Sequence, residues 1–208
     1  MKYGLWIVLF LLSCSQKNPQ HWWKKIDDSQ KPSWEISPDQ ARKGEVILSK
    51  RNELGAFSNF SHTPFYLDGM TYTSIEGFWQ MMKYPDSKLR GDIRGKKKYP
   101  YTRLEVSQMY GFQAKKAGDL ANKIGPVWVS YQGDKFNYKD EGQGQAYHYQ
   151  LIERATRAKI NQHPNLKELL IKTDSLELKP DHPQGDKPPR SYQYYKILMK
   201  IRSEFLLK

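Results

Sequence analysis

The first half of the chain alternates between short apolar runs and turn residues. Residues 46–48 form an aliphatic run that is typical of a short strand. Two more β-prone runs, 64–67 and 70–72, flank the pair Asp68-Gly69, which is a strong signal for a hairpin turn. The following segment has apolar residues at i, i+3, i+4 and i+7, namely Ile75, Phe78, Trp79 and Met82. The pattern therefore predicts a strand, a hairpin and then a helix with one apolar face.

Helical periodicity dominates the second half. The segments predicted as helices are 104–118, 147–161, a stretch that starts at Pro164, and 191–207. Residues 127–129 predict one more brief strand or a buried turn, and loops are expected at 87–103, 132–145 and 180–189. Because strands come early and helices late, the expected class is α+β and not alternating α/β. The chain should fold as a mostly helical single domain with a small antiparallel β-hairpin or sheet near its N-terminus.

The N-terminal residues have the features of a targeting segment. A short basic start precedes an apolar run at 3–12 that is too short to span a bilayer as a stable helix. The run ends in Leu11-Leu12-Ser13-Cys14, which resembles a bacterial lipoprotein processing site with Cys14 as the lipidated N-terminus. An ordinary cleaved signal or an uncleaved apolar anchor is the alternative. Ser15 stands where inner-membrane retention favours Asp, so we expect a lipid-anchored protein of the bacterial envelope, at the outer membrane.

Composition suggests where the folded part begins. Residues 15–44 are polar and lack periodicity, which predicts a flexible tether between a signal peptide at 1–14 and a folded domain at 45–208. Trp22, Trp23 and Trp34 are exceptions, and we expect them to dock on the domain or on lipid headgroups.

The chain is basic and rich in aromatic residues. Its 208 residues carry a formal charge of +12, and 13% of them are aromatic. The charge favours an anionic partner: a nucleotide, a nucleic acid or an anionic membrane surface. The aromatic side chains suit surfaces that stack planar groups. Because many proteins are simply basic, the charge alone does not choose a partner.

The sequence leaves carboxylates as the candidates for chemistry. The chain has no Gly-rich phosphate loop, no Gly-x-Ser-x-Gly, and no paired Cys or His set with the spacing of a metal site. Its only cysteine lies in the N-terminal signal. We therefore expect no metal and no cofactor.

Glu76 is the main candidate, and it has two interpretations. Thr73-Ser74-Ile75-Glu76 fits a helix capping box, in which Glu76 would bond back to the Thr73 amide. The positive helix start would then hold the pKa of Glu76 down. An ionised carboxylate at this place could also stabilise an oxocarbenium-like transition state or draw a proton from water. The two roles do not exclude each other.

The other candidates are equally open on spacing alone. Asn59 fits a turn residue or a ligand to the substrate. Lys83 continues the polar helical row of Glu76 and Gln80, and it fits an exposed lysine or a partner for phosphate. Trp128 fits a core residue or a platform for a base.

These residues together resemble the NADAR, or YbiA-like, family. The matching positions, in the family's order, are Ser58-Asn59-Phe60, Pro64-Phe65, Asp68-Gly69, Tyr72, Ser74-Ile75-Glu76, Gln80 and Lys83. Shorter matches follow as far as Arg202, so the resemblance covers about 46–205. It implies an N-glycosidase; known family activities concern riboflavin-pathway intermediates and ADP-ribose attached to guanine in nucleic acid. Glu76 would be the catalytic carboxylate, and the substrate-binding residues would be Asn59, Phe60, Gln80, Lys83 and Trp128.

The chain departs from the family pattern in two places. Many members have Glu-His where this chain has Glu76-Gly77, and many have a Trp-Gly motif near the C-terminal Asp, where this chain has 181–190.

From the candidate residues and the resemblance, the main hypothesis is hydrolysis of an N-glycosidic bond in an ADP-ribosyl or related ribose-phosphate compound. The alternatives are a non-catalytic lipoprotein that binds ADP-ribose, nucleotides or nucleic acid, and a surface lipoprotein that docks another protein.

Overall fold

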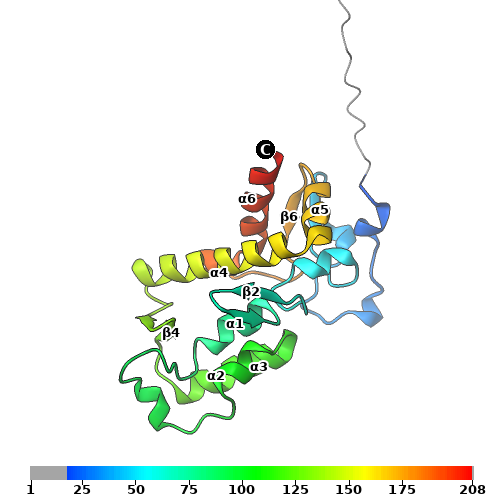
Figure 1. The fold of residues 1–208 in the computed structure, drawn as a ribbon. Helices are drawn as coiled ribbons and strands as arrows, with labels where there is room; N and C mark the ends of the chain where they lie inside the picture. The colour runs from blue at the N-terminus through cyan, green and yellow to red at the C-terminus, as the bar shows by residue number, and fades with distance from the viewer. Residues whose placement is uncertain (1–17, 208) are drawn as a thin grey trace, which may run out of the picture.

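Helix α1 (Ile75–Met81) lies at the centre of the protein, and all of its residues are buried. The computed structural model describes residues 18–207. Around α1 pack α2 (Arg103–Ser107), α3 (Gly111–Ile124) and α4 (Gln143–Gln162). In Figure 1 the long helix α4 runs between α1–α3 on one side and α5 (Pro164–Lys172) and α6 (Tyr194–Leu206) on the other. The predicted α+β class with a mostly helical domain is confirmed.

The strands form separate pairs. The predicted hairpin is β2 (Phe65–Leu67) paired antiparallel with β3 (Met70–Tyr72). Its turn residues have positive φ angles, 50° at Asp68 and 87° at Gly69, as a tight hairpin requires. A second hairpin joins β4 (Val129–Tyr131) to β5 (Asp134–Phe136), where the pattern predicted a loop after residue 131.

The remaining pair is parallel. Strand β1 (Glu45–Ile47) pairs with β6 (Glu177–Lys179), which lies near the other end of the chain. This pairing was not predicted, because a three-residue strand with a distant partner has no local signal. It brings the segment after β6 next to the segment after β1. Six short 3-10 helices complete the description of residues 18–207: η1 (Gln20–Trp23), η2 (Asp28–Gln30), η3 (Pro38–Gln40), η4 (Glu53–Phe57), η5 (Ile93–Lys96) and η6 (Arg190–Tyr192).

The segment 18–44 packs on the domain, so the prediction of a flexible tether at 15–44 does not hold for these residues. Trp22 is fully buried, and its indole nitrogen donates a hydrogen bond of 2.7 Å to Glu53. Trp23 donates one of 2.9 Å to the backbone carbonyl of Glu45. The expectation of docking on the domain is met for Trp22 and Trp23, whereas Trp34 is exposed, and the folded unit starts well before residue 45.

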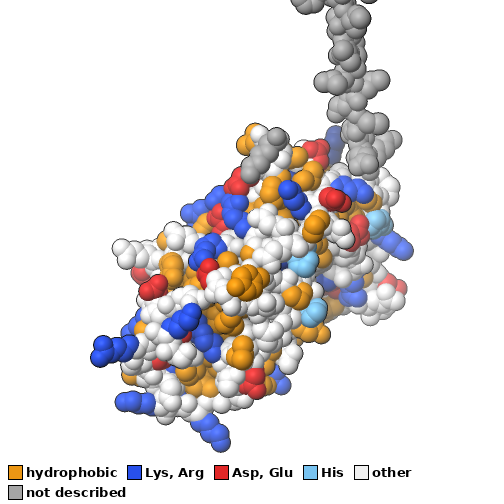
Figure 2. Space-filling view, viewed as in Figure 1, with side chains coloured by type: hydrophobic (Ala, Val, Ile, Leu, Met, Phe, Trp, Pro, Cys, Tyr) orange, Lys and Arg blue, Asp and Glu red, His pale blue; other side chains and the backbone are white. Residues whose placement is uncertain are grey.

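The basic stretch 87–103 is also more ordered than its charge predicted. The Arg94 side chain is fully buried and donates to Asp92 and to the carbonyl of Met82. Arg103 donates to the carbonyls of Tyr84 and Ser130. Two of the cations in this loop therefore fasten it to the core. Other Lys and Arg side chains project from several places on the face shown in Figure 2.

The signal predicted at 1–14, with lipidation at Cys14, lies outside the described residues. Between residues 18 and 207, no helix has the length and apolar character needed to cross a bilayer.

Candidate active site

Ser74, and not Thr73, caps α1. The Ser74 hydroxyl accepts a hydrogen bond of 2.8 Å from the Gly77 amide and donates one of 2.9 Å to the Met109 carbonyl. Glu76 is therefore only the second residue of the helix, and the capping-box interpretation of its side chain is wrong. Its carboxylate is free to make other contacts.

The Glu76 carboxylate is nearly buried, with 9% of the residue exposed. Its Oε1 accepts a hydrogen bond of 2.7 Å from the Gln80 amide, one helical turn later. Burial raises the pKa of Glu76, although the Gln80 hydrogen bond and the charges of Lys83 and Lys115 oppose the rise. The expectation of a lowered pKa is wrong, because loss of water around the carboxylate outweighs the short helix's dipole.

Glu76 lines a hollow of about 600 Å³, which we call the Glu76 hollow. Its other lining residues are Trp34, Lys50, Ser58, Asn59, Phe60, Phe112, Lys115, His182, Pro183, Gln184, Tyr192 and Tyr194. Among the described residues, 18–207, Glu76 is the only acidic one in this wall. The Glu76 amide donates a hydrogen bond of 2.9 Å to the Asn59 carbonyl, which ties the helix start to the loop that carries Asn59 and Phe60. The structure thus brings three of the predicted site residues together.

Lys83 and Gln80 lie behind this wall. Lys83 is 8% exposed, and its ammonium lies 5.2 Å from the ring centre of Trp79 and 5.9 Å from that of Tyr138. Burial lowers the pKa of Lys83 to about 8, against the opposing attraction of Glu76. Within residues 18–207 Lys83 forms no ion pair. The side-chain amide of Gln80 donates its hydrogen bond to Glu76. The polar row predicted from the helical spacing is present, but it faces the interior and not solvent.

Trp128 lies outside the Glu76 hollow. Its ring is covered by the Arg94 guanidinium at 4.4 Å and by the Lys135 ammonium at 4.5 Å. The structure therefore does not bring Trp128 together with Glu76, and its predicted contact with a base has no support in the geometry.

The sequence reasoning missed the cluster of Lys50, Asp181 and His182. Asp181 is buried, pairs with the Lys50 ammonium and accepts from His182 Nδ1 at 2.9 Å. Burial alone would raise the pKa of Asp181, but the contacts with His182 and Lys50 outweigh it and hold the pKa below its usual range. The parallel β1–β6 pairing creates this cluster. The only signal for it was the departure from the family pattern at 181–190.

Lys159 on α4 holds the loop that shapes the site. This fully buried lysine donates to the Ser58 carbonyl at 3.0 Å and to the Ser61 hydroxyl at 2.7 Å. Burial lowers its pKa to about 7, so above neutral pH a neutral amine with two N–H groups meets these two acceptors. Lys159 thereby fixes the turn that contains Asn59.

We expect Lys159→Met to remove a pH dependence of stability. Between pH 7 and pH 10.5 the unfolded chain holds the lysine proton while the folded chain releases it, so wild-type stability rises with pH. The rise should reach about 1.4 kcal/mol per pH unit, and below pH 7 the contribution should be constant. Urea unfolding at several pH values measures it. Lys172→Met, at an exposed position of α5, is the control, and identical slopes in both variants would contradict the assignment.

Known proteins resemble this chain in sequence and in fold. No family model matches it. N-glycosidase YbiA of Escherichia coli (strain K12) is 28% identical over 140 residues, which are 67% of this chain and 70% of that protein. The protein of the same name from Shigella boydii serotype 4 (strain Sb227) is 26% identical over the same shares. The NMR structure of the E. coli protein YbiA superimposes with a TM-score of 0.50 at 21% identity, over 81% of this chain and 89% of that one. The sequence homology and the shared fold thus support the resemblance stated above: this chain is a distant homologue of N-glycosidase YbiA over two thirds of its length, and it shares the YbiA-like fold.

Proposed function

We propose that the protein is an N-glycosidase that hydrolyses the N-glycosidic bond of an ADP-ribosyl or related ribose-phosphate compound, with Glu76 as the catalytic carboxylate. The observation that carries the proposal is the position of Glu76. It is the single acidic residue in a wall of aromatic and cationic side chains, around a hollow large enough for a nucleotide. The homology to proteins named N-glycosidase supports the reaction class.

The reaction needs a negative charge beside the sugar carbon. When the bond from the ribose carbon to nitrogen breaks, the electron pair leaves with the base, which takes up a proton, and the carbon becomes cationic. The Glu76 carboxylate would stabilise that cation and accept a proton from the water whose oxygen forms the new bond. The base takes its proton from solvent, and Glu76 returns one proton to solvent, so that the carboxylate is regenerated. Gln80 holds Oε1, so Oε2 remains for the substrate side.

The rest of the wall fits the remaining parts of such a substrate. Lys50 is paired with Asp181 and Lys115 with Asp119, and each ammonium keeps further N–H donors for a phosphate group. Phe60, Phe112 and Tyr192 supply aromatic faces for a base. Asn59, beside Glu76, supplies an amide for a ribose hydroxyl.

The direct test is incubation of the full chain with a panel of ADP-ribosylated and riboflavin-pathway compounds. For the substrate class that the protein hydrolyses, mass spectrometry should detect both products, the free base and the corresponding sugar. If no member of the panel releases a base, the proposal fails for these substrates.

The pH profile should report Glu76 and Lys83 together. We expect kcat/KM to rise with pH as Glu76 ionises above its ordinary pKa of 4.5, and to fall above about pH 8 as Lys83 loses its proton. The decline follows because neutral Lys83 no longer supports the ionised carboxylate or attracts an anionic substrate. Initial rates across the pH range measure both limbs.

Two variants of Lys83 separate its charge from its packing. Lys83→Met should lose the alkaline limb and shift the acid limb to higher pH, because the Lys83 charge lowers the pKa of Glu76. Lys83→Arg keeps a charge at high pH and should move the alkaline limb upward. An unchanged profile in both variants would show that Lys83 takes no part.

A binding protein without catalysis is the second candidate. The formal charge of +12 and the Glu76-Gly77 departure from the family pattern favour it. It predicts saturable binding of ADP-ribose by calorimetry with no released base, whereas the enzyme predicts both binding and product.

A further inference from the structure

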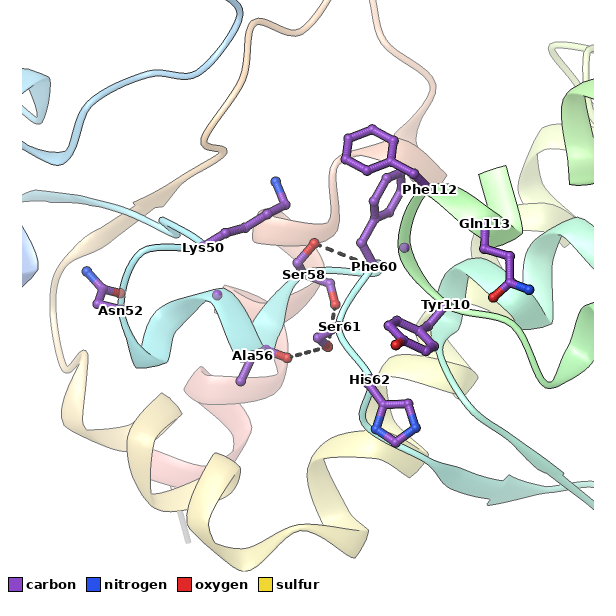
Figure 3. A pocket seen from close by; sticks show the side chains of 12 residues that line it. Lys50, Asn52, Ala56, Ser58, Phe60, Ser61, His62, Tyr110, Phe112 and Gln113 are labelled. Carbon is purple, nitrogen blue, oxygen red and sulfur yellow. Dashed lines mark hydrogen bonds between the residues drawn. The ribbon is translucent and has the colours of Figure 1, made fainter. Parts of the chain in front are cut away.

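A second hollow lies next to the Glu76 hollow. It also measures about 600 Å³, and we call it the Tyr110 hollow (Figure 3). Its lining residues are Lys50, Asn52, Gly55, Ala56, Ser58, Phe60, Ser61, His62, Tyr110, Gly111, Phe112 and Gln113. Lys50, Ser58, Phe60 and Phe112 line both hollows. A ligand seated at Glu76 could therefore extend over these shared residues into the second hollow.

Two aromatic pairs border the Tyr110 hollow. Phe60 and Phe112 meet edge to face, with ring centres 5.3 Å apart, and Phe112 is 65% exposed. His62 and Tyr110 meet in the same way at 4.8 Å, and Tyr110 is 49% exposed. Figure 3 shows the two pairs at neighbouring places on the rim. Such exposed aromatic faces around a hollow suit the stacking of a planar group.

The polar groups of this hollow suit an anionic nucleotide. Among residues 18–207 no lining residue is acidic. Lys50 lines both hollows, and its ammonium, which is paired with the buried Asp181, keeps further N–H donors for a phosphate oxygen. The hydroxyl of Ser61 is already bonded to Lys159 and to the Ala56 carbonyl. Within residues 18–207 the Gln113 side chain makes no hydrogen bond to the protein, so its amide is available to form hydrogen bonds with the edge of a nucleotide base.

We infer that the Tyr110 hollow is a subsite for the base of a second nucleotide unit, joined through phosphate at Lys50 to the unit that reacts at Glu76. The inference rests on the proposed function. It narrows the proposed substrates to compounds in which the reacting unit at Glu76 is joined through phosphate to a second nucleotide unit. A free dinucleotide-type compound and a nucleic-acid strand share this chemistry.

Binding measurements with Tyr110→Ala test the subsite. Tyr110 lines the Tyr110 hollow but not the Glu76 hollow. It is the N-cap residue of α3, but its side chain makes no capping hydrogen bond, so the substitution removes none. Calorimetry of the full chain should show ADP-ribose binding about tenfold weaker in this variant, the usual effect of losing one base stack. Ribose 5-phosphate, which has no base, should bind equally to both proteins. His62→Ala should weaken ADP-ribose binding in the same direction.

Tyr66→Ala is the matched control, because Tyr66 is 57% exposed on β2 and lines neither hollow. Unchanged ADP-ribose binding in Tyr110→Ala, or no saturable binding of ADP-ribose to the wild type, would overturn the subsite. The first outcome leaves the proposed function standing if Glu76 still proves necessary for turnover. A short single-stranded oligonucleotide that binds more tightly than ADP-ribose, and loses affinity in Tyr110→Ala, would identify the strand as the source.

Discussion

Glu76→Gln should lower kcat by about 10²- to 10⁴-fold, the usual contribution of a positioned general base. The amide has the shape of the carboxylate and can still accept the Gln80 hydrogen bond, so the fold should remain. It cannot take a proton from water or stabilise a cationic sugar carbon. Thermal stability should stay equal or rise, because the ionised form of Glu76 is disfavoured by burial, as its raised pKa indicates.

Turnover assays and thermal unfolding of the same samples would measure the two effects. Glu105→Gln is the control, since Glu105 is an exposed carboxylate in the first turn of α2 and glutamine can keep its capping bond to Thr102. If Glu76→Gln turned over substrate at the wild-type rate, Glu76 would not be the catalytic carboxylate. A loss of activity together with a large loss of stability would point to a structural role instead.

The parts of the fold with local signals were predictable. The hairpin turn at Asp68-Gly69 follows from two residues that accept positive φ. The apolar stripe of Ile75, Phe78 and Trp79 follows from helical spacing, and all three side chains are buried. The place of Glu76 at the start of this helix was predictable for the same reason.

The environment of the site residues was not predictable from spacing. Glu76, Gln80 and Lys83 form a polar row that a helical wheel assigns to solvent, yet all three residues are buried and only Glu76 reaches the wall of a hollow. The contact between Lys50 and Asp181 joins positions 131 residues apart through a parallel strand pair. Such contacts depend on tertiary packing, and no local pattern encodes them.

The residue after Glu76 shows how tertiary packing restricts the sequence. A Cβ atom on Gly77 would lie 2.4 Å from the Met109 carbonyl oxygen and 3.0 Å from that of Val106. Both obstacles are backbone atoms of the segment that packs on α1, so no side-chain rotation relieves the contact. The same Met109 oxygen accepts from the Ser74 cap, which fixes its position. The histidine that many family members have after the glutamate would require this segment to lie farther from α1.

Gly77→Ala is therefore expected to destabilise the protein by about 3 kcal/mol, at the upper end for overpacking of a core. The better helix propensity of alanine, about 1 kcal/mol, would offset only part of this. Urea unfolding measures the change, and Gly95→Ala is the control, because a Cβ at Gly95 meets no atom within 4 Å. Activity should fall as well, since α1 can relieve the overlap only by moving Glu76. Wild-type stability in Gly77→Ala would mean that α1 and the 106–109 segment are not in contact, and the geometry assigned to Glu76 would be wrong with it.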